Sequence, residues 1–346
     1  MSSGVATPDQ TMGAALSGNT PAPRARPALL EVRDLCIDVD TPAGLVRLVD
    51  GVDLSLKAGD RVALVGESGS GKSITARAMM KLDTNVRLSG SVQLDGVELL
   101  GLGEKAMSRI RGSRIGMVFQ DPMHALNPLQ TIGEQVAEPL RLRGVPRKEA
   151  WERACALLDE LGVPRAPERM RAYPHEFSGG MRQRVVLAMA LIGEPDVLIA
   201  DEPTTALDVR VQKQVLQLLD EVTRQRQLAV LMITHDLAVV AGFTERVVVM
   251  YAGRKIEERT TEALFAAPAH PYTNALLEAL PRLDQAARPL DPIPGAPPSP
   301  AARPQGCAFH PRCPLAVEIC RQEIPKLTVQ QDGGLVACHV VDKGMG

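Results

Sequence analysis

Aromatic residues, net charge and long apolar runs are scarce in this 346-residue chain. Phe, Trp and Tyr make up 3% of it, so Leu, Val, Ile, Ala and Met must build most of any core. The formal net charge of −2 gives no overall electrostatic reason to expect nucleic-acid binding. No apolar run approaches the length of a transmembrane helix, and no secretion signal opens the chain. A role at a membrane would therefore come through partner subunits.

A glycine-rich motif follows an apolar run at 61–65 that is typical of a buried strand, and precedes a helix-like segment at 74–80. Strand, glycine turn and helix is the context in which this motif binds polyphosphate, because the helix N-terminus faces the anion. Lys72 would reach the β- and γ-phosphates, and the Ser73 hydroxyl would ligate Mg²⁺. The alternative is a glycine turn that binds nothing, which the Lys-Ser pair and both flanks disfavour. We expect the phosphates to be held by Gly66, Ser68, Gly69, Ser70, Gly71, Lys72 and Ser73.

Two carboxylates follow a second apolar run, at 197–200. Asp201 is placed to hold Mg²⁺, and Glu202 to orient or deprotonate an attacking water. The alternative is a capped strand end, since Pro203 starts a turn. Asp-Glu-Pro alone is therefore weak evidence for a catalytic site.

Three further positions follow apolar runs or open a helix. Gln120 is placed to join the Mg²⁺ shell, and His235 to contact a γ-phosphate, although a lone His at a strand end is more often structural. The stretch Phe177-Ser178-Gly179-Gly180 is either a second anion site at a helix start or an N-capped helix.

The order of strand-like and helix-like segments predicts an α/β fold. Strand patterns occupy 30–39, 45–52, 61–65, 92–96, 115–119, 197–200, 229–233 and 246–250. The segment from Pro122 to about Ile192 is helical in pattern, and a helix over 210–225 precedes the strand at 229–233. This layout indicates a nucleotide-binding sheet with a helical insert. The Pro-, Ala- and Arg-rich stretch 281–304 is typical of an extended connector.

Taken together, the motifs at 66–73, Gln120, 178–180, Asp201-Glu202 and His235 resemble the ATPase domain of ABC transporters. The resemblance covers about Leu29 to Glu258, and its motifs are jointly very specific. It implies that Ser178, Gly179 and Gly180 meet ATP held by a second ATPase subunit, with Asp208 at the interface between the two. It also implies Glu202 as general base and His235 as switch histidine. The family often stacks adenine on an aromatic residue, whereas the comparable position here is Val39.

Shorter stretches, such as His270-Pro271-Tyr272-Thr273 and Ile293-Pro294-Gly295, resemble the ATP-binding subunits of dipeptide and oligopeptide ABC importers. This implies an ATPase at the cytoplasmic face of the inner membrane. Its partners would be a second, homologous ATPase subunit in a heterodimer, two transmembrane permease subunits and, indirectly, a solute-binding protein. Nickel and glutathione importers share the pattern. A non-transport ABC ATPase is the more distant alternative, and such proteins usually have a long coiled coil or two cassettes.

The expected domains are a flexible tail at 1–28, an ATPase domain at 29–263 with a helical subdomain at about 122–192, and an extension at 264–346. Four of the six cysteines lie in the extension: Cys307, Cys313, Cys320 and Cys338. Disulfides are rare in the cytosol, so these cysteines predict a metal centre or plain thiols. The resemblance favours a [4Fe–4S] cluster, with Zn²⁺ as the alternative and His310 and His339 as substitute ligands. Cys36 and Cys155 are expected in the core.

Overall fold

A mixed eight-stranded sheet forms the centre of the computed structural model, which describes residues 1, 27–120, 125–204, 208–280 and 293–342. Five neighbouring strands are parallel, and three antiparallel strands extend one side. In order across the sheet they are β11 (Thr328–Val329), β12 (Leu335–Val336), β10 (Arg254–Thr260), β9 (Arg246–Tyr251), β3 (Arg61–Val65), β8 (Ala229–Thr234), β7 (Val197–Asp201) and β6 (Ile115–Val118).

The central strands are apolar because both of their faces are covered. All residues of β7 and β8, and all but the first of β3, are buried. The register pairs Val65 with Thr234 on one side of β8 and Asp201 with Ile233 on the other. The carboxyl ends of β3, β8 and β7 therefore meet at one edge, where parallel sheets bind ligands.

A second, antiparallel sheet has the order β2 (Gly44–Leu56), β1 (Leu30–Thr41), β4 (Val86–Leu94) and β5 (Val97–Glu98). Its inner face shares one apolar cluster with α1 (Lys72–Met79) and α2 (Glu104–Ile110), in which Leu30, Met79 and Met107 are buried. The helix that starts at Lys72 is thus held between two sheets.

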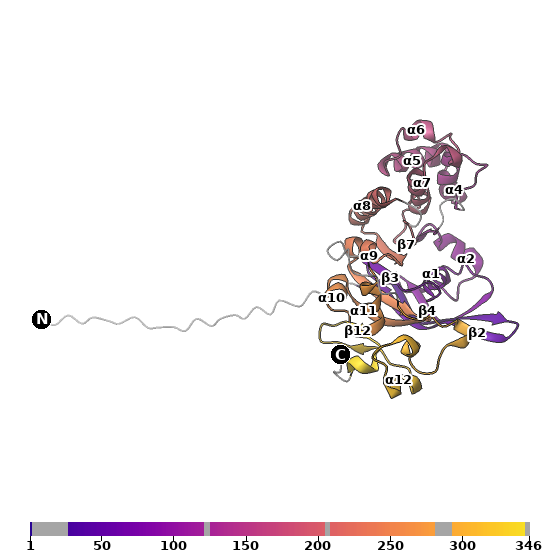
Figure 1. Ribbon diagram of the computed structural model, residues 1–346. Coiled ribbons are helices and arrows are strands. Elements are labelled where there is room, and N and C mark those ends of the chain that lie inside the picture. Colours follow the sequence, from indigo (N-terminus) through magenta and orange to yellow (C-terminus); the bar gives the residue numbers. More distant parts are fainter. Residues whose placement is uncertain (2–26, 121–124, 205–207, 281–292, 343–346) are drawn as a thin grey trace.

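A helical lobe lies above the sheets in Figure 1 and contains α4 (Ile132–Leu142), α5 (Arg147–Glu160), α6 (Ala166–Arg169), η1 (Pro174–Glu176) and α7 (Gly179–Leu191). Helix α4 begins with a capping box between Thr131 and Glu134. A Cβ at Gly133 would lie 2.6 Å from the Trp151 ring, so a glycine is what lets α4 and α5 approach this closely. The lobe's apolar cluster continues into α8 (Val209–Arg226) and the adjacent face of the main sheet.

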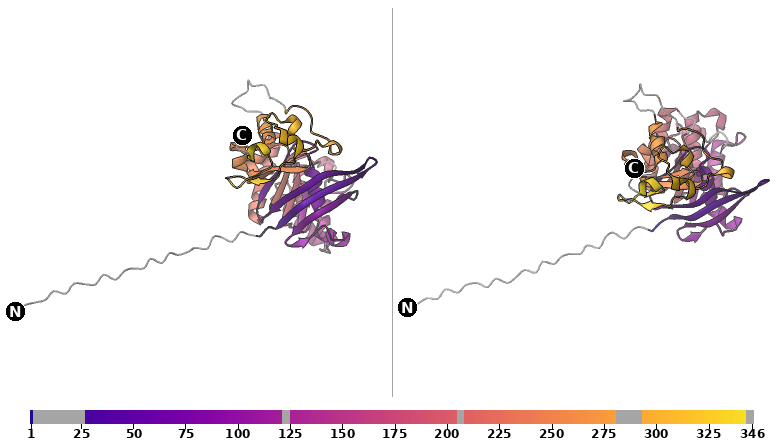
Figure 2. Two further views of the ribbon diagram at one scale, coloured as in Figure 1. Left: turned by 90° about the horizontal axis from the view of Figure 1, so that it is seen from below. Right: turned by 60° about the horizontal axis from the view of Figure 1, so that its bottom comes forward.

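The C-terminal extension is built onto both sheets, as Figure 2 shows from two sides. Strand β12 pairs with β10, with Val336 opposite Glu257. The Arg303 guanidinium donates to the Leu48 carbonyl of β2 at 2.7 Å. The helices not yet given are α9 (Leu237–Phe243), which precedes the extension, and α10 (Thr261–Ala266), at its start. Within the extension lie α11 (Pro271–Glu278), η3 (Pro300–Ala302), η4 (His310–Arg312), α12 (Glu318–Gln322) and α13 (His339–Asp342).

The expected α/β fold with a mixed sheet, a helical insert and a cysteine-containing extension is confirmed. Each predicted strand overlaps one in the structure, and the helix expected at 210–225 is α8. The strand expected at 45–52 runs further, to Leu56, because its pairing with β1 continues to Leu30. Most of the expected flexible start, and residues 281–292 of the expected connector, lie outside the described residues.

The extension should make stability depend on pH through His270. This residue is the N-cap of α11, where its Nδ1 accepts from the Tyr272 N–H at 3.0 Å. Complete burial lowers the pKa of His270 from 6.5 to about 3. The unfolded chain therefore binds a proton that the folded chain does not. The free energy of unfolding should fall by about 2 kcal/mol between pH 7.5 and pH 5.

The variant His270→Asn keeps an N-cap oxygen but cannot titrate. Urea unfolding at both pH values should show a loss of unfolding free energy smaller by about 2 kcal/mol than in the parent chain. An equal loss in the two proteins would contradict the assignment.

Candidate functional site

The turn between β3 and α1 requires glycine. Gly66 and Gly71 have φ angles of 151° and 102°, which L side chains rarely adopt. A Cβ at Gly66 would lie 2.3 Å from the Met250 carbonyl oxygen. Gly71 is the N-cap of α1, whose first N–H groups have no partner within the helix. The predicted phosphate loop therefore ends on a helix N-terminus, the arrangement that binds anions.

The Lys72 ammonium lies inside this loop with only 6% of the residue exposed. Its Nζ donates to the carbonyl oxygens of Gly66 at 2.8 Å and Glu67 at 3.0 Å. Burial lowers the pKa of Lys72, and the carboxylates of Glu202 and Asp201 oppose that change. A cation held by neutral carbonyls can exchange them for phosphate oxygens, so the loop fits a polyphosphate.

Ser73 and Asp201 meet as a site for Mg²⁺ requires. The Ser73 hydroxyl donates to Asp201 Oδ1 at 2.9 Å, although the two residues are 128 positions apart. Burial raises the pKa of Asp201, and the Ser73 hydrogen bond opposes this change. A hydroxyl and a buried carboxylate are oxygen ligands of the kind that Mg²⁺ binds beside phosphates.

Glu202 lies between the two other predicted catalytic side chains. Its Oε2 accepts from the Gln120 amide at 2.8 Å, and its Oε1 lies 3.1 Å from His235 Nδ1. Glu202 has a φ of 48°, an uncommon backbone for a residue other than glycine, and its N–H donates to the Ile233 carbonyl at 2.8 Å. The structure thus brings together Gln120, Glu202 and His235, which sequence reasoning had taken from three different segments.

The predicted signature residues lie on the helical lobe. Ser178 is exposed and caps α7 by accepting from the Met181 N–H at 3.4 Å. A Cβ at Gly180 would lie 2.5 Å from a Val211 methyl of α8. Asp208 is also exposed and caps α8 through the Val211 N–H at 2.9 Å. The N-cap alternative is therefore present at Ser178, and capping does not exclude an anion at the same helix start.

Comparison with known proteins gives the family of this chain. Residues 49–205 match the family model described as ABC transporter, and residues 256–320 match that of the oligopeptide/dipeptide transporter C-terminal region. The chain is 50% identical to the oligopeptide transport ATP-binding protein OppD of Salmonella typhimurium over 92% of this chain and 96% of that protein. The OppD protein of Escherichia coli is also 50% identical, over 90% and 93%. This chain belongs to the ABC transporter family.

Solved structures give the same result for the ATPase domain. A dimeric, ADP- and phosphate-bound form of the ATP-binding cassette MJ0796 superimposes with a TM-score of 0.61 at 29% identity, covering 67% of this chain and 98% of that one. CbiO1 of Clostridium perfringens, part of an ABC transporter complex, gives 0.61 at 28% identity over 69% and 91%. The chain is an ABC-type ATPase, and ATP and Mg²⁺ are what its family uses.

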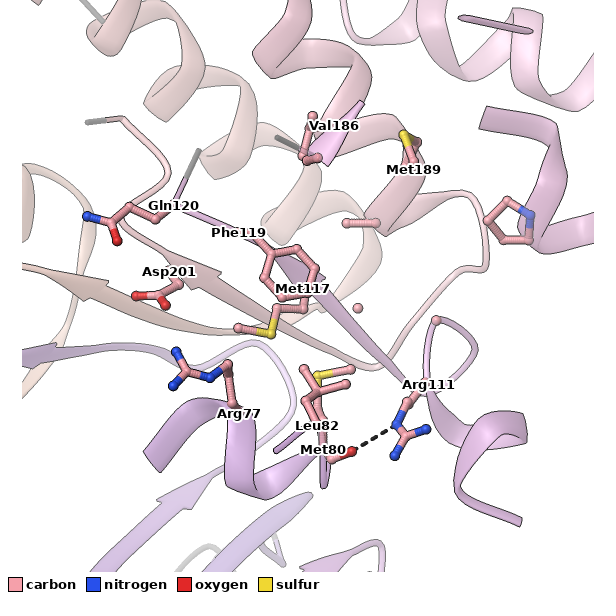
Figure 3. Close-up of a pocket in the computed structure, with 15 residues that line it drawn as sticks. Arg77, Met80, Leu82, Arg111, Met117, Phe119, Gln120, Val186, Met189 and Asp201 are labelled. Carbon is pink, nitrogen blue, oxygen red and sulfur yellow. Dashed lines mark hydrogen bonds between the residues drawn. The ribbon is translucent and has the colours of Figure 1, made fainter. Parts of the chain in front are cut away.

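A pocket of about 740 Å³ separates the sheet edge of this ABC ATPase from its helical lobe. Figure 3 shows Phe119 and Met117 in its middle, Val186 and Met189 on the lobe side, and Arg77 with Leu82 on the α1 side. Phe119 is 45% exposed, which is high for an aromatic residue in a chain that has so few. Gln120 and Asp201 also line this pocket, so it borders the candidate ATP site. No helix among the described residues is long and apolar enough to cross a membrane.

The thiols of Cys313, Cys320 and Cys338 lie close enough to Cys307 to interact with it. Burial raises the pKa of Cys307 to about 11, and the thiols of Cys320, Cys338 and Cys313 contribute to that rise. However, no three His, Cys, Asp or Glu side chains among the described residues are arranged to hold a metal ion. The described residues therefore do not form the expected iron–sulfur or zinc centre as a set of metal ligands.

The two histidines considered as substitute ligands contact backbone carbonyls, and the two remaining cysteines lie where core residues were expected. His310 contacts the Cys307 carbonyl at 3.0 Å, and His339 contacts the Glu323 carbonyl at 3.0 Å. Cys36 is buried, and Cys155 packs against the lobe's apolar cluster, as expected of core residues.

Sequence reasoning missed the contacts that the extension makes with the phosphate loop. The Arg312 guanidinium pairs with both carboxylate oxygens of Glu67, at 2.7 and 3.0 Å. The Tyr272 hydroxyl accepts from the Glu67 N–H at 2.8 Å. The contacts span more than 200 positions, so no local pattern could have revealed them.

The variant Glu202→Gln should bind ATP normally but hydrolyse it about 10²–10⁴-fold more slowly, because the amide cannot take a proton from water. ATP turnover of the assembled transporter and calorimetric ATP binding measure the two effects. The control is Glu194→Gln, since Glu194 has a similar φ of 55° but pairs with Arg153 instead. Near-normal turnover in Glu202→Gln would remove Glu202 from this role.

Proposed function

We propose that this chain is the ATP-hydrolysing subunit that powers a peptide-type ABC importer from the cytoplasmic face of the inner membrane. The meeting of Lys72, the Ser73–Asp201 pair and Glu202 at one sheet edge carries the ATPase part of the proposal. The C-terminal match and the OppD relatives support the peptide part. A putative peptide import ATP-binding protein of Brucella abortus, 46% identical over 87% of this chain and 92% of that one, adds to this support.

In the proposed reaction, the loop from Gly66 to Ser73 binds the phosphates and Lys72 moves from its carbonyl partners to them. Ser73, Asp201 and Gln120 would hold Mg²⁺, which would neutralise charge on the phosphates when bound. Glu202 accepts the proton of the water that attacks the γ-phosphorus, while the bond to ADP breaks. His235, 3.1 Å from Glu202, orients that carboxylate and contacts the γ-phosphate.

ATP would join two ATPase subunits, because the signature residues lie on a different lobe from the phosphate loop. Ser178, Gly179 and Gly180 would contact ATP held by a second, homologous subunit, with Asp208 beside them. The exposure of Ser178 and Asp208 supports this assignment, and a solved relative is a dimer. We assign the pair as a heterodimer, as in the importers that the sequence resembles.

The pocket between lobe and sheet would receive a cytoplasmic helix of a permease subunit. Its apolar lining and exposed Phe119 suit an apolar helix face, and Gln120 links it to Glu202. Two permease subunits, with a solute-binding protein beyond them, would complete the importer.

The proposed division of the chain is a tail at 1–28, the ATPase domain at 29–263 with its helical subdomain at about 122–192, and the extension at 264–346.

The two-subunit site predicts different defects on its two faces. Lys72→Ala should weaken ATP binding to the isolated chain, because it removes the buried cation. Ser178→Arg should leave that binding nearly unchanged, because its ATP belongs to the partner subunit. Calorimetry on the isolated chain and ATP turnover of the complex separate these effects, and both variants should abolish turnover. Equal loss of ATP binding in both would contradict the shared site.

We also propose that the four thiols of the extension bind a [4Fe–4S] cluster, with Zn²⁺ as the alternative, because Cys313, Cys320 and Cys338 lie close enough to Cys307 to raise the pKa of its thiol. Protein prepared without oxygen should then contain iron and sulfide, and Cys320→Ser should lose both while the control Cys36→Ser should not. Stoichiometric zinc without iron would refute the cluster. Neither metal in the parent protein would refute the centre altogether.

A further inference from the structure

The C-terminal extension contacts the phosphate loop at Glu67. Its carboxylate is paired with Arg312 of η4, and its N–H donates to the Tyr272 hydroxyl of α11. Its carbonyl oxygen accepts from Lys72 Nζ at 3.0 Å and from the Ser70 N–H at 3.2 Å. The polar groups of one loop residue therefore join the extension on one side to the phosphate-binding lysine on the other.

Arg312 is built into this position. Its side chain is 5% exposed, and its guanidinium makes five hydrogen bonds, the full number of its N–H groups. Two go to Glu67, and the others go to Pro294 O at 2.8 Å, Tyr251 Oη at 3.2 Å and Ile293 O at 3.4 Å. A buried, fully satisfied arginine with two parallel bonds to a carboxylate fixes that carboxylate in direction as well as distance.

An aromatic cluster supports the arginine and the tyrosine. Tyr251, Tyr272 and Phe309 are each at most 2% exposed, and their ring centroids are 4.7 to 5.4 Å apart. Three of the chain's nine aromatic residues are thus placed between the phosphate loop and the cysteine-bearing tail. Such packing holds Tyr272 and η4 in one arrangement.

We propose that Arg312 and Tyr272 are positioning residues of the ATP site, which clamp Glu67 so that its carbonyl and Lys72 keep the geometry that receives the phosphates. The extension is then a structural part of the nucleotide site as well as an appendage to the sheet. The proposal rests on the proposed ATP site, and it concerns how the phosphate loop is held rather than which groups touch ATP.

The cleanest test removes one hydroxyl. Tyr272→Phe keeps the ring packing but leaves the partly buried Glu67 N–H without its hydroxyl partner, and ATP affinity of the full-length chain should fall about tenfold. The matched control is Tyr251→Phe, which removes a hydroxyl from the same cluster that contacts Arg312 but not the loop, and its affinity should change less than threefold. Unchanged affinity in Tyr272→Phe, or an equal loss in both variants, would overturn the clamp.

A second pair of variants tests the charge. Arg312→Met should raise KM for ATP in the assembled transporter about tenfold with a much smaller change in kcat, and Arg312→Lys should recover part of that loss. The control Asp332→Asn breaks another ion pair between extension and cassette, Arg259–Asp332 at 3.0 Å, and should leave KM unchanged. A loss of thermal stability in Arg312→Met with parental KM would overturn the proposal. Failure of the parent chain to bind ATP would instead overturn the ATP site itself.

Discussion

The rest of this structure depends on one constraint, the burial of a positive charge at Lys72. Burial lowers the pKa of Lys72, and the carboxylates of Glu202 and Asp201, together with the carbonyls of Gly66 and Glu67, oppose the cost of its charge. Parallel pairing of β3, β8 and β7 brings the two carboxylates to the lysine. In the candidate ATP site, nearby carboxylates and carbonyls therefore stabilise the charge of Lys72, and bound phosphates would add further negative charge beside it.

The C-terminal extension contacts the same loop through Glu67. Because aromatic residues are few, the position of Tyr251, Tyr272 and Phe309 behind the phosphate loop is informative. Tyr272 of this cluster and the neighbouring Arg312 both contact Glu67. In the proposed arrangement, the C-terminal extension holds the phosphate loop together with the main sheet.

Much of the fold, and the meeting of most candidate site residues at one sheet edge, could be predicted from the sequence. Buried parallel strands are continuous apolar runs, and the motif at 66–73 encodes its glycine turn locally. The joining of Gln120, Glu202 and His235 could be anticipated because each follows a strand that ends at the same sheet edge. The clamp on Glu67 could not, since it depends on how η4 and α11 pack. The metal centre expected from the four cysteines and the family resemblance is not formed as a ligand set among the described residues, because a sequence resemblance does not determine the arrangement of sulfur atoms in space.

A structure of the full chain with ATP and Mg²⁺, in the Glu202→Gln variant, tests the central claim most directly. Lys72 Nζ should leave the carbonyl oxygens of Gly66 and Glu67 and bind the β- and γ-phosphates, while Arg312 and Tyr272 keep their contacts with Glu67. A nucleotide bound elsewhere, or bound at the loop with Lys72 still on its carbonyl partners, would contradict this account.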